Sequence, residues 1–409
     1  MRQSAVPNEV SSPPDAAPPR LMSPGEDSAW RPASERRPAT PTEPVPEQRA
    51  SDPATLEPKV EPSPSGSART NSAQPARFYA LDALRGLSIG LMVFVNWAGN
   101  WSLPEQLRHA EYSGLTIADT VFPAFLVAMG TAIPYATRTG WRRAFGRAIM
   151  LILIGSALVS YHYGQPYDLT VGVLQLIGVT YLLAWLVTRL PRLVQLPLVA
   201  AVLIGVTAAY LGYEVPGIGA GSFEREANLG DWVDSLLGFA PHPENPHAIL
   251  SAFGTVFIGV LAGRISRDFK GWGRLGMLTV LGAGTLGLGL ALAGVVPITK
   301  YLWTPSFALV TGGIAVLALV VLALLIPRRS KGGPLRPLVV LGGHAIVVYA
   351  FSETVVARAH GEWLWPHWEP IVTERWGELA AGVAFPAGAV LACLVLAWAM
   401  ELLRIRVRL

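Results

Sequence analysis

The sequence has little cysteine and little charge, and both shortages limit what the protein can be. One of the 409 residues is a cysteine, Cys393, so neither an internal disulfide nor a multi-cysteine metal site can form. Charged residues make up 15% of the chain, against roughly 25% in soluble domains. Its apolar residues fall into blocks of about 20, the length that crosses ~30 Å of hydrocarbon. Because a backbone in lipid must satisfy its own hydrogen bonds, these blocks predict transmembrane helices.

Residues 1–76 lack such apolar blocks. Stretches such as "VSSPPDAAPPR" and "EPSPSGSART" are rich in Pro, Ser, Ala and Glu. Burial cannot offset the entropy of ordering a segment of this composition, so we expect a disordered tail that acts as a spacer or a tether. The membrane domain is expected to cover residues 77–409.

The predicted fold class is an all-α polytopic membrane protein with about ten transmembrane helices after the disordered N-terminal tail. The helices are expected at residues 80–98, 115–137, 144–162, 171–189, 195–213, 247–265, 274–296, 303–326, 336–358 and 382–403.

The connections between these helices alternate in charge. Those after the second, fourth, sixth and eighth helices carry most of the basic residues, and the positive-inside rule makes them cytoplasmic. We therefore expect both termini in the cytoplasm, and the loops with His109 and Asp168 and the segment 214–246 outside. The composition favours a bacterial inner membrane. The loops also account for the pI of 9.3, so no nucleic-acid partner is expected. The basic residues are Arg138, Arg142, Arg143 and Arg147; Arg189 and Arg192; Arg264, Arg267, Lys270 and Arg274; and Arg328, Arg329, Lys331 and Arg336.

The stretch "EQLRHAEYSGLTIADTVFP" places His109 on the outer side, shortly after the first helix. A histidine exchanges protons near neutral pH, and its neutral form is also a nucleophile. Asn96, near the end of the first helix, could hold a carbonyl oxygen or orient the ring. Two plainer interpretations remain open: His109 is an interfacial loop residue, and Thr116 with Asp119 forms a capping box at a helix start.

Polar groups inside apolar helices are costly in lipid and are candidate site residues by default. Alternatives exist for each of them. Asp82 and Arg85 have the spacing of an ion pair within a helix. Gln175 could form a hydrogen bond to a neighbouring helix, and His344 could be a buried structural residue. Lys300 could extend to the interface or meet an anionic acceptor. The candidates are Asp82, Arg85, Gln175, Lys300, His344, Ser352 and Glu353.

The stretch "PHPENPH" contains His242, His247 and a glutamate, which could be taken for a metal site. Its prolines exclude a helix that would present these side chains together, so no metal is expected.

Five stretches, in order, resemble the membrane core of the heparan-α-glucosaminide N-acetyltransferase family. These are "LDALRGLSIGLMVFVNWAGN", "HAEYSGLTIADTVFPAFLVAMG", "GVLQLIGVTYLLA", "PITKYLWTPSFAL" and "LGGHAIVVYAFSE". The family's active-site histidine falls on His109 and its asparagine on Asn96. Arg85 matches the arginine of an Arg-Gly pair. In two departures, Leu176 replaces an arginine and His344 an asparagine.

The resemblance implies a transmembrane acetyltransferase that moves an acetyl group from cytoplasmic acetyl-CoA to the amino group of a glucosamine-type sugar outside. Acetyl-CoA is then a co-substrate, with no bound cofactor. His109 would be base or nucleophile, Asn96 would stabilise the oxyanion, and Glu105, Glu111 or Asp119 would orient the ring. The remaining expected partners are membrane lipid and an amino-sugar or glycan acceptor.

Other functions fit the same pattern of helices. A transporter or flippase also has many helices with few buried polar groups, although no internal repeat supports one here. An inactive relative that serves as a scaffold is a third reading. The sequence leaves open the acceptor, the length of the acyl group and the oligomeric state, a homodimer being one option.

Overall fold

Eight helices of the described chain are long and apolar enough to cross a membrane, and a bent pair makes a ninth span if counted as one. This computed structural model describes residues 78–98, 103–136, 139–163, 172–240, 242–326, 332–405 and 407. The tail predicted at residues 1–76 lies outside them. The fold class is confirmed: the protein is an all-α, multi-pass integral membrane protein.

The spans follow the predicted apolar blocks closely. They comprise α1 (Tyr79–Asn96), α2 (Ile117–Ala132), α3 (Trp141–Tyr163), α5 (Arg192–Gly212), α7 (Ile249–Asp268), α8 (Gly271–Leu292), α9 (Pro305–Leu325) and α13 (Glu378–Leu402).

Two expected spans differ from the prediction. The helix expected at 171–189 is α4 (Val173–Val187), which has 15 residues. The helix expected at 336–358 is broken: α10 (Arg336–Gly343) and α11 (Ala345–Phe351) meet at His344 in a bend of 69°. Two glycines precede His344, and glycine pairs are a common cause of helix kinks. Two π-helical turns (Ser352–Val356 and Ala359–Trp363) and α12 (Trp365–Trp376) follow.

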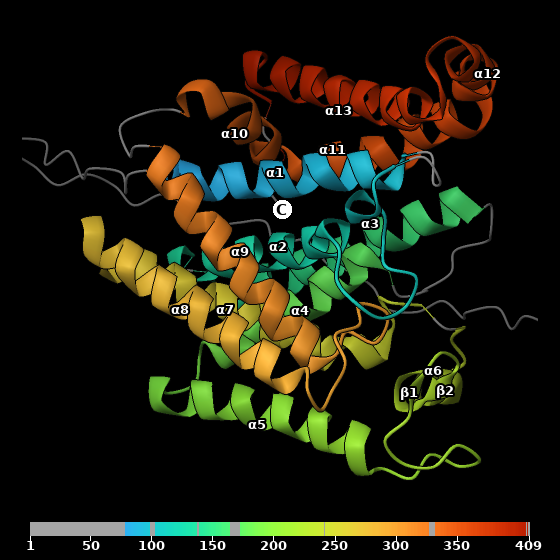
Figure 1. Cartoon of the computed structure of the whole chain (residues 1–409). Coiled ribbons are helices and arrows are strands. Elements are labelled where there is room, and N and C mark those ends of the chain that lie inside the picture. The colour runs from blue at the N-terminus through green and yellow to red at the C-terminus, as the bar shows by residue number, and fades with distance from the viewer. Residues whose placement is uncertain are drawn as a thin grey trace, which may run out of the picture. The chain divides into compact units, whose positions relative to one another are not determined.

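The helices run broadly across the view of Figure 1, with α1 packed between α2 on one side and α10, α11 and α13 on the other. The most extensive pairings are α1 with α10, α2 with α7, α3 with α4, and α8 with α9. Helix α5 lies at the edge of the group.

Glycines allow two of these pairings to bring backbones into direct contact. A Cβ atom on Gly86 of α1 would overlap the carbonyl of Leu338, which lies on α10, and one on Gly342 would overlap that of Asp82. Gly130 and Gly259 make the same kind of contact between α2 and α7. Small residues give membrane helices this close approach.

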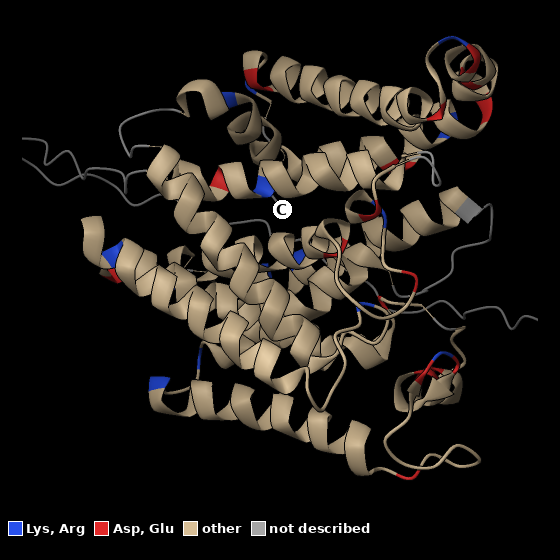
Figure 2. Cartoon of the chain, in the orientation of Figure 1, with Lys and Arg blue, Asp and Glu red and all other residues tan. Residues whose placement is uncertain are grey.

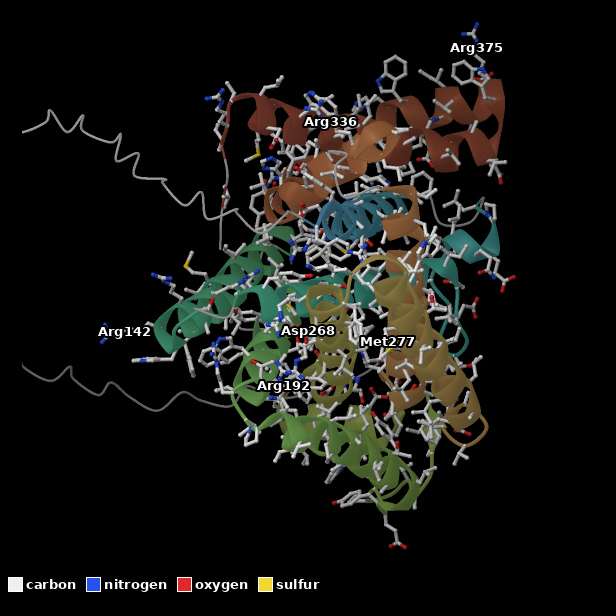
Figure 3. All side chains as sticks on the ribbon, turned by 90° about the vertical axis from the view of Figure 1, so that its left-hand side faces the viewer. Arg142, Arg192, Asp268, Met277, Arg336 and Arg375 are labelled. Carbon is white, nitrogen blue, oxygen red and sulfur yellow. The ribbon has the colours of Figure 1, made fainter. Side chains whose placement is uncertain are left out.

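Basic side chains gather at one end of the helices, which we call the basic end. It includes the first turns of α3, α5 and α10 and the last turns of α7. Figure 2 shows this end on the left, and Figure 3 views it directly, with Arg142, Arg192 and Arg336 labelled. This is the end for which the positive-inside rule predicts the cytoplasmic side. Four of the predicted basic residues, Arg138, Arg328, Arg329 and Lys331, lie outside the described residues.

Between α5 and α7, on the opposite end, the chain forms a small substructure that the sequence did not predict. A hairpin of β1 (Phe223–Glu224) and β2 (Ala227–Asn228) leads into the short helix α6 (Leu229–Leu236). Asn228 caps α6 by accepting a hydrogen bond from the backbone N–H of Asp231 at 2.9 Å. This cap fixes where the chain leaves the hairpin.

Candidate active site

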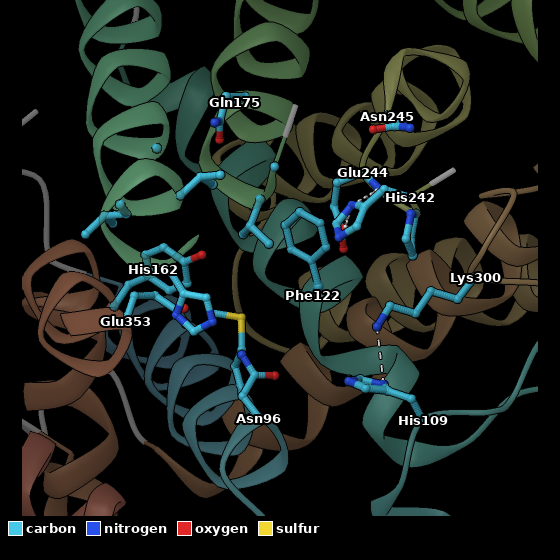
Figure 4. A pocket seen from close by; sticks show the side chains of 18 of the residues that line it. Asn96, His109, Phe122, His162, Gln175, His242, Glu244, Asn245, Lys300 and Glu353 are labelled. Atoms are coloured by element: carbon cyan, nitrogen blue, oxygen red, sulfur yellow. Dashed lines mark hydrogen bonds and ion pairs between the residues drawn. The ribbon is translucent and has the colours of Figure 1, made fainter. Parts of the chain in front are cut away.

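A cavity of about 680 Å³ opens at the end of the helices opposite to the basic end. Its walls come from the last turn of α1, the first turns of α2 and α4, the last turns of α3, the loop before α9 and the stretch before α7 (Figure 4). Segments that are far apart in sequence therefore supply its polar side chains. These are Asn96, His109, Ser160, His162, Gln175, His242, Glu244, Asn245, Lys300, Tyr349 and Glu353.

The side chain of His109 points into this cavity, and one of its two ring nitrogens contacts Asp119. Its Nδ1 lies 2.8 Å from Oδ1 of Asp119, whose side chain is 1% exposed. A carboxylate can only accept hydrogen bonds, so this contact requires the proton on Nδ1. The lone pair is then on Nε2, the atom that is left for chemistry.

The two carboxylate oxygens of Asp119 have different hydrogen-bond partners. While Oδ1 faces His109, Oδ2 accepts hydrogen bonds from the hydroxyl of Thr116 at 2.9 Å, from the Thr116 N–H at 3.3 Å and from the Ala110 N–H at 3.1 Å. The predicted capping box at the start of α2 is therefore present, and it coexists with the contact to the ring. Of the three acidic residues considered, Asp119 is the one that orients His109.

Lys300 joins this pair from 191 residues away. Its Nζ lies 3.2 Å from Nδ1 of His109 and 3.8 Å from Oδ1 of Asp119 (Figure 4). Since Nδ1 carries the hydrogen, the ammonium lies beside the ring and pairs with the carboxylate. The prediction left Lys300 either at the interface or facing an acceptor, and the structure places it at the cavity wall.

Backbone contacts hold the loop of His109 against the loop of Lys300. The N–H of Gly114, at φ +104°, donates to the carbonyl of Ile298 at 2.8 Å. The hydroxyl of Thr299 donates to the carbonyl of Tyr112 at 2.5 Å, and the rings of Tyr112 and Tyr301 pack with centroids 5.2 Å apart. These contacts fix the distance between His109 and Lys300.

Asn96 is the last residue of α1 and lines the same cavity as His109. Its side chain hydrogen-bonds to Glu353, which the π-helical turn presents to the cavity. A carboxamide has two N–H donors, and among the described residues Glu353 is the group that contacts this side chain. Gln175, in the first turn of α4, lines the opposite wall.

Sequence reasoning missed His242 and Glu244 as site residues. Their side chains form an ion pair at 2.9 Å and face the cavity. The hydrogen bond to Glu244 raises the pKa of His242, against the effect of burial. Burial acts to raise the pKa of Glu244, but the hydrogen bond and charge of His242, with the charge of Lys300, hold it below its usual value. Each shift favours the charged form of its group, so the two shifts together widen the pH range over which the pair is ionised. Its signal was present in "PHPENPH" but was considered for metal binding alone.

Three predicted binding residues do not line this cavity. Arg85 pairs with Asp82 at 3.8 Å, as the plainer interpretation had it. Ser352 accepts a hydrogen bond from the indole N–H of Trp97 at 2.8 Å. His344 is buried at the break between α10 and α11, with Nε2 3.5 Å from a carboxylate oxygen of Glu401.

The histidines of "PHPENPH" face different partners. While His242 pairs with Glu244, Nδ1 of His247 lies 2.7 Å from Asp234 and its Nε2 lies 3.1 Å from the carbonyl of Tyr301. Across the described ranges, no group of three or more His, Cys, Asp or Glu side chains could hold a metal ion.

Comparisons with known proteins match this part of the chain. A family model described as heparan-alpha-glucosaminide N-acetyltransferase, catalytic, matches residues 77–302, which include Asn96, His109, Asp119 and Lys300. A Homo sapiens protein named heparan-alpha-glucosaminide N-acetyltransferase is 26% identical over 360 residues, or 69% of this chain and 53% of the human protein. The Mus musculus protein of that name is 35% identical over 129 residues, or 27% of this chain and 19% of its own.

The chain spans about half the length of the human relative. Glu353, Ser352 and His344 lie beyond the matched residues. Because the family model covers more than half of the chain, the protein belongs to the heparan-alpha-glucosaminide N-acetyltransferase catalytic family.

Proposed function

We propose that this protein is a transmembrane N-acetyltransferase. It moves an acetyl group from acetyl-CoA on the cytoplasmic side to the amino group of a glucosamine-type sugar on the periplasmic side of a bacterial inner membrane. Its N- and C-termini then lie in the cytoplasm. The observation that carries the proposal is the cluster of His109, Asp119 and Lys300 at a cavity that Asn96 also lines.

His109 supplies the reacting nitrogen through Nε2. In a covalent route, Nε2 attacks the thioester carbon, the C–S bond breaks and CoA leaves as the thiolate. The sugar amine then attacks the acetyl carbon, the bond from that carbon to Nε2 breaks, and the freed Nε2 takes the proton that the amine loses. In a direct route, Nε2 takes the proton of the amine while the amine attacks the thioester, and CoA again leaves as the thiolate. Both routes need the tautomer that the contact of Nδ1 with Asp119 imposes.

Asn96 is the proposed oxyanion donor. Either route places negative charge on the thioester oxygen, and a positioned carboxamide N–H stabilises that charge. Its bond to Glu353 fixes the carboxamide plane, as neighbouring groups do for preorganised donors.

The opposite wall suits the acceptor. Glu244 and His242 form an ionised pair facing the cavity, with Asn245 and Lys300 nearby on its lining. Carboxylates and amides bond sugar hydroxyls and amines, and a cavity of about 680 Å³ falls in the range that holds small-molecule ligands. The donor nucleotide stays at the cytoplasmic side, because its phosphates cannot cross lipid.

A vesicle assay tests the proposal. Purified protein is placed in lipid vesicles with its orientation determined, [¹⁴C]acetyl-CoA is added on the side of the basic end, and glucosamine is enclosed on the other side. N-acetylglucosamine carrying the label should form inside. Glucosamine that crosses the membrane unacetylated would instead support a transporter, and neither product in a folded protein would support a scaffold.

A further inference from the structure

A second pocket, which we call the arginine pocket, lies at the basic end and shares no lining residue with the cavity of His109. It has a volume of about 410 Å³ and lies between the end of α2, the turn joining α4 to α5 and the last turns of α7. Four arginines line it, and none of its described lining residues is acidic. They are Arg189, Arg192, Arg264 and Arg267.

Neutral groups hold the guanidinium groups of Arg189 and Arg264 in place. Arg189 donates to the carbonyl of Thr139 at 2.8 Å and lies over the ring of Trp185 at 4.4 Å. Arg264 donates to the side-chain oxygen of Gln195. Gln195 is 1% exposed, and its side-chain N–H donates in turn to the carbonyl of Leu190 at 2.6 Å. Buried Gln195 thus positions a charged neighbour without neutralising it.

The balance of charge leaves the pocket positive. Arg267 donates to the carbonyl of Pro134 at 3.0 Å and pairs with Asp268 at 2.9 Å. Within the described part of the chain, no other ion pair involves the four arginines. Three like charges around one hollow repel each other, and an anion between them relieves this repulsion. The planar guanidinium group binds phosphate oxygens in pairs, so phosphate is the anion that fits best.

The surroundings of the pocket indicate where the phosphate comes from. Helix α5, which forms one wall, lies at the edge of the helices in Figure 1, and Leu193 and Leu196 beside Arg192 are 90% and 56% exposed. Figure 3 labels Arg192 at the same end. A ligand with its phosphates among the arginines would find an apolar, lipid-facing flank directly next to them. Basic pockets between membrane helices bind anionic lipid headgroups in this way.

We propose that the arginine pocket binds the headgroup of an anionic phospholipid, with its acyl chains along α5. Three uncompensated arginines match a lipid with two phosphates better than a lipid with one. The proposal does not depend on the acetyl-transfer reaction. The phosphates of CoA share the same chemistry and are the competing source, which the experiment separates from lipid.

The test measures binding of cardiolipin, phosphatidylglycerol and phosphatidylcholine to the purified protein by native mass spectrometry, and of CoA by calorimetry. Arg192→Gln and the combined variant Arg189→Gln/Arg192→Gln should weaken cardiolipin binding at least tenfold, since each charge-assisted bond lost costs about that factor. The matched control is Arg142→Gln/Arg143→Gln, two exposed arginines at the same end but outside the pocket.

Three outcomes would overturn the proposal. The control variant could lose as much cardiolipin binding as the pocket variants, or the wild type could bind phosphatidylcholine as tightly as cardiolipin. In the third outcome, the pocket variants lose CoA binding while their cardiolipin binding is unchanged. The last would assign the pocket to the donor. Arg264→Lys keeps the positive charge but removes the planar guanidinium group that binds phosphate oxygens in pairs. A several-fold loss of cardiolipin affinity in this variant therefore supports paired phosphate contacts, even if the combined variant does not fold. Unchanged cardiolipin binding in a folded Arg264→Lys protein contradicts them.

Discussion

The Nδ1 atom of His109 lies 2.8 Å from Oδ1 of Asp119, and the other oxygen of the same carboxylate caps helix α2. The start of a membrane-spanning helix and the orientation of the proposed catalytic ring therefore depend on one side chain. This relationship explains why a strongly polar residue lies at the membrane edge, and it allows the two roles to be separated by mutation.

His109→Ala should lower the rate of acetyl transfer by 10²–10⁴, the loss typical of a removed general base. The protein should still purify, because the side chain is 42% exposed and adds little to helix packing. His109→Gln should be nearly as inactive, since glutamine can neither take the proton nor accept the acetyl group. Labelled transfer in vesicles measures this. More than about a tenth of wild-type turnover in folded His109→Ala exceeds what the loss of a general base permits.

The same variants separate the two routes. With labelled acetyl-CoA and no acceptor, the covalent route predicts an acid-labile acetyl group on the wild type and none on His109→Ala. A wild type that stays unlabelled under these conditions supports direct transfer.

Asp119→Asn should reduce turnover about ten- to a hundredfold, because it replaces a charge-assisted hydrogen bond worth roughly 1.5–3 kcal/mol by a weaker one. The amide oxygen of asparagine can still accept the hydrogen bond from the Thr116 N–H in the capping box, so the melting temperature should change little. Thr116→Ala is the matched control. It removes the hydroxyl that donates to Oδ2 and accepts from the backbone of Asp119, while the ring contact stays in place, so it should cost about 1 kcal/mol of stability and little activity. Equal activity losses in the two variants would show that the cap, and not the ring contact, matters.

The ion pair of His242 and Glu244 should make stability depend on pH. The pKa of His242 is raised, so its contribution is complete below the unfolded value of about 6.5 and is lost as pH rises through the folded value. The pKa of Glu244 is lowered, so its contribution is complete above about 4.3 and is lost as pH falls through the folded value. The pair therefore stabilises most between about pH 4.3 and 6.5.

His242→Gln keeps a hydrogen-bond donor but cannot be charged. The difference in melting temperature between the wild type and this variant should be greatest near pH 5.5 and small at pH 9. A difference that grows towards pH 9 would mean that the pair is not ionised as described.

The orientation in the membrane can be measured by labelling single cysteines in a Cys393→Ala background. Ser113 is exposed at the cavity end, so Ser113→Cys should react with an impermeant thiol reagent from the periplasm. Lys270 is exposed at the basic end, and Lys270→Cys should not react. Lys270 is preferable to its neighbour Gly271, whose φ of +56° strains a cysteine. The reverse labelling pattern would invert the topology.

The length and spacing of apolar blocks predicted the helices well, because hydrocarbon thickness is a local constraint that the chain must meet block by block. The contact between His109 and Asp119 was within reach of sequence reasoning, since the two residues are ten apart and the capping box fixes one of them. Lys300 was assigned no partner within the chain, because its contact with His109 and Asp119 depends on how distant loops pack.

Other features left weaker signals. "LGGHAI" contains the glycine pair at the break before α11, which could have been read as a kink. The hairpin of β1 and β2 has no glycine or asparagine in its turn and instead places Glu226 at φ +62°, so the usual hairpin signal is missing.

The direct backbone contacts of Gly86 with α10 and of Gly130 with α7 have a consequence for mutational scanning. No side chain larger than hydrogen fits at either position without moving two helices apart, so both should tolerate almost no substitution. Exposed His109, the proposed catalytic residue, should show the opposite pattern, with normal protein levels and lost turnover. In a screen that scores activity alone, substitutions of the glycines and of the histidine would look alike. Protein abundance measured beside activity would separate residues needed for folding from the residue needed for catalysis.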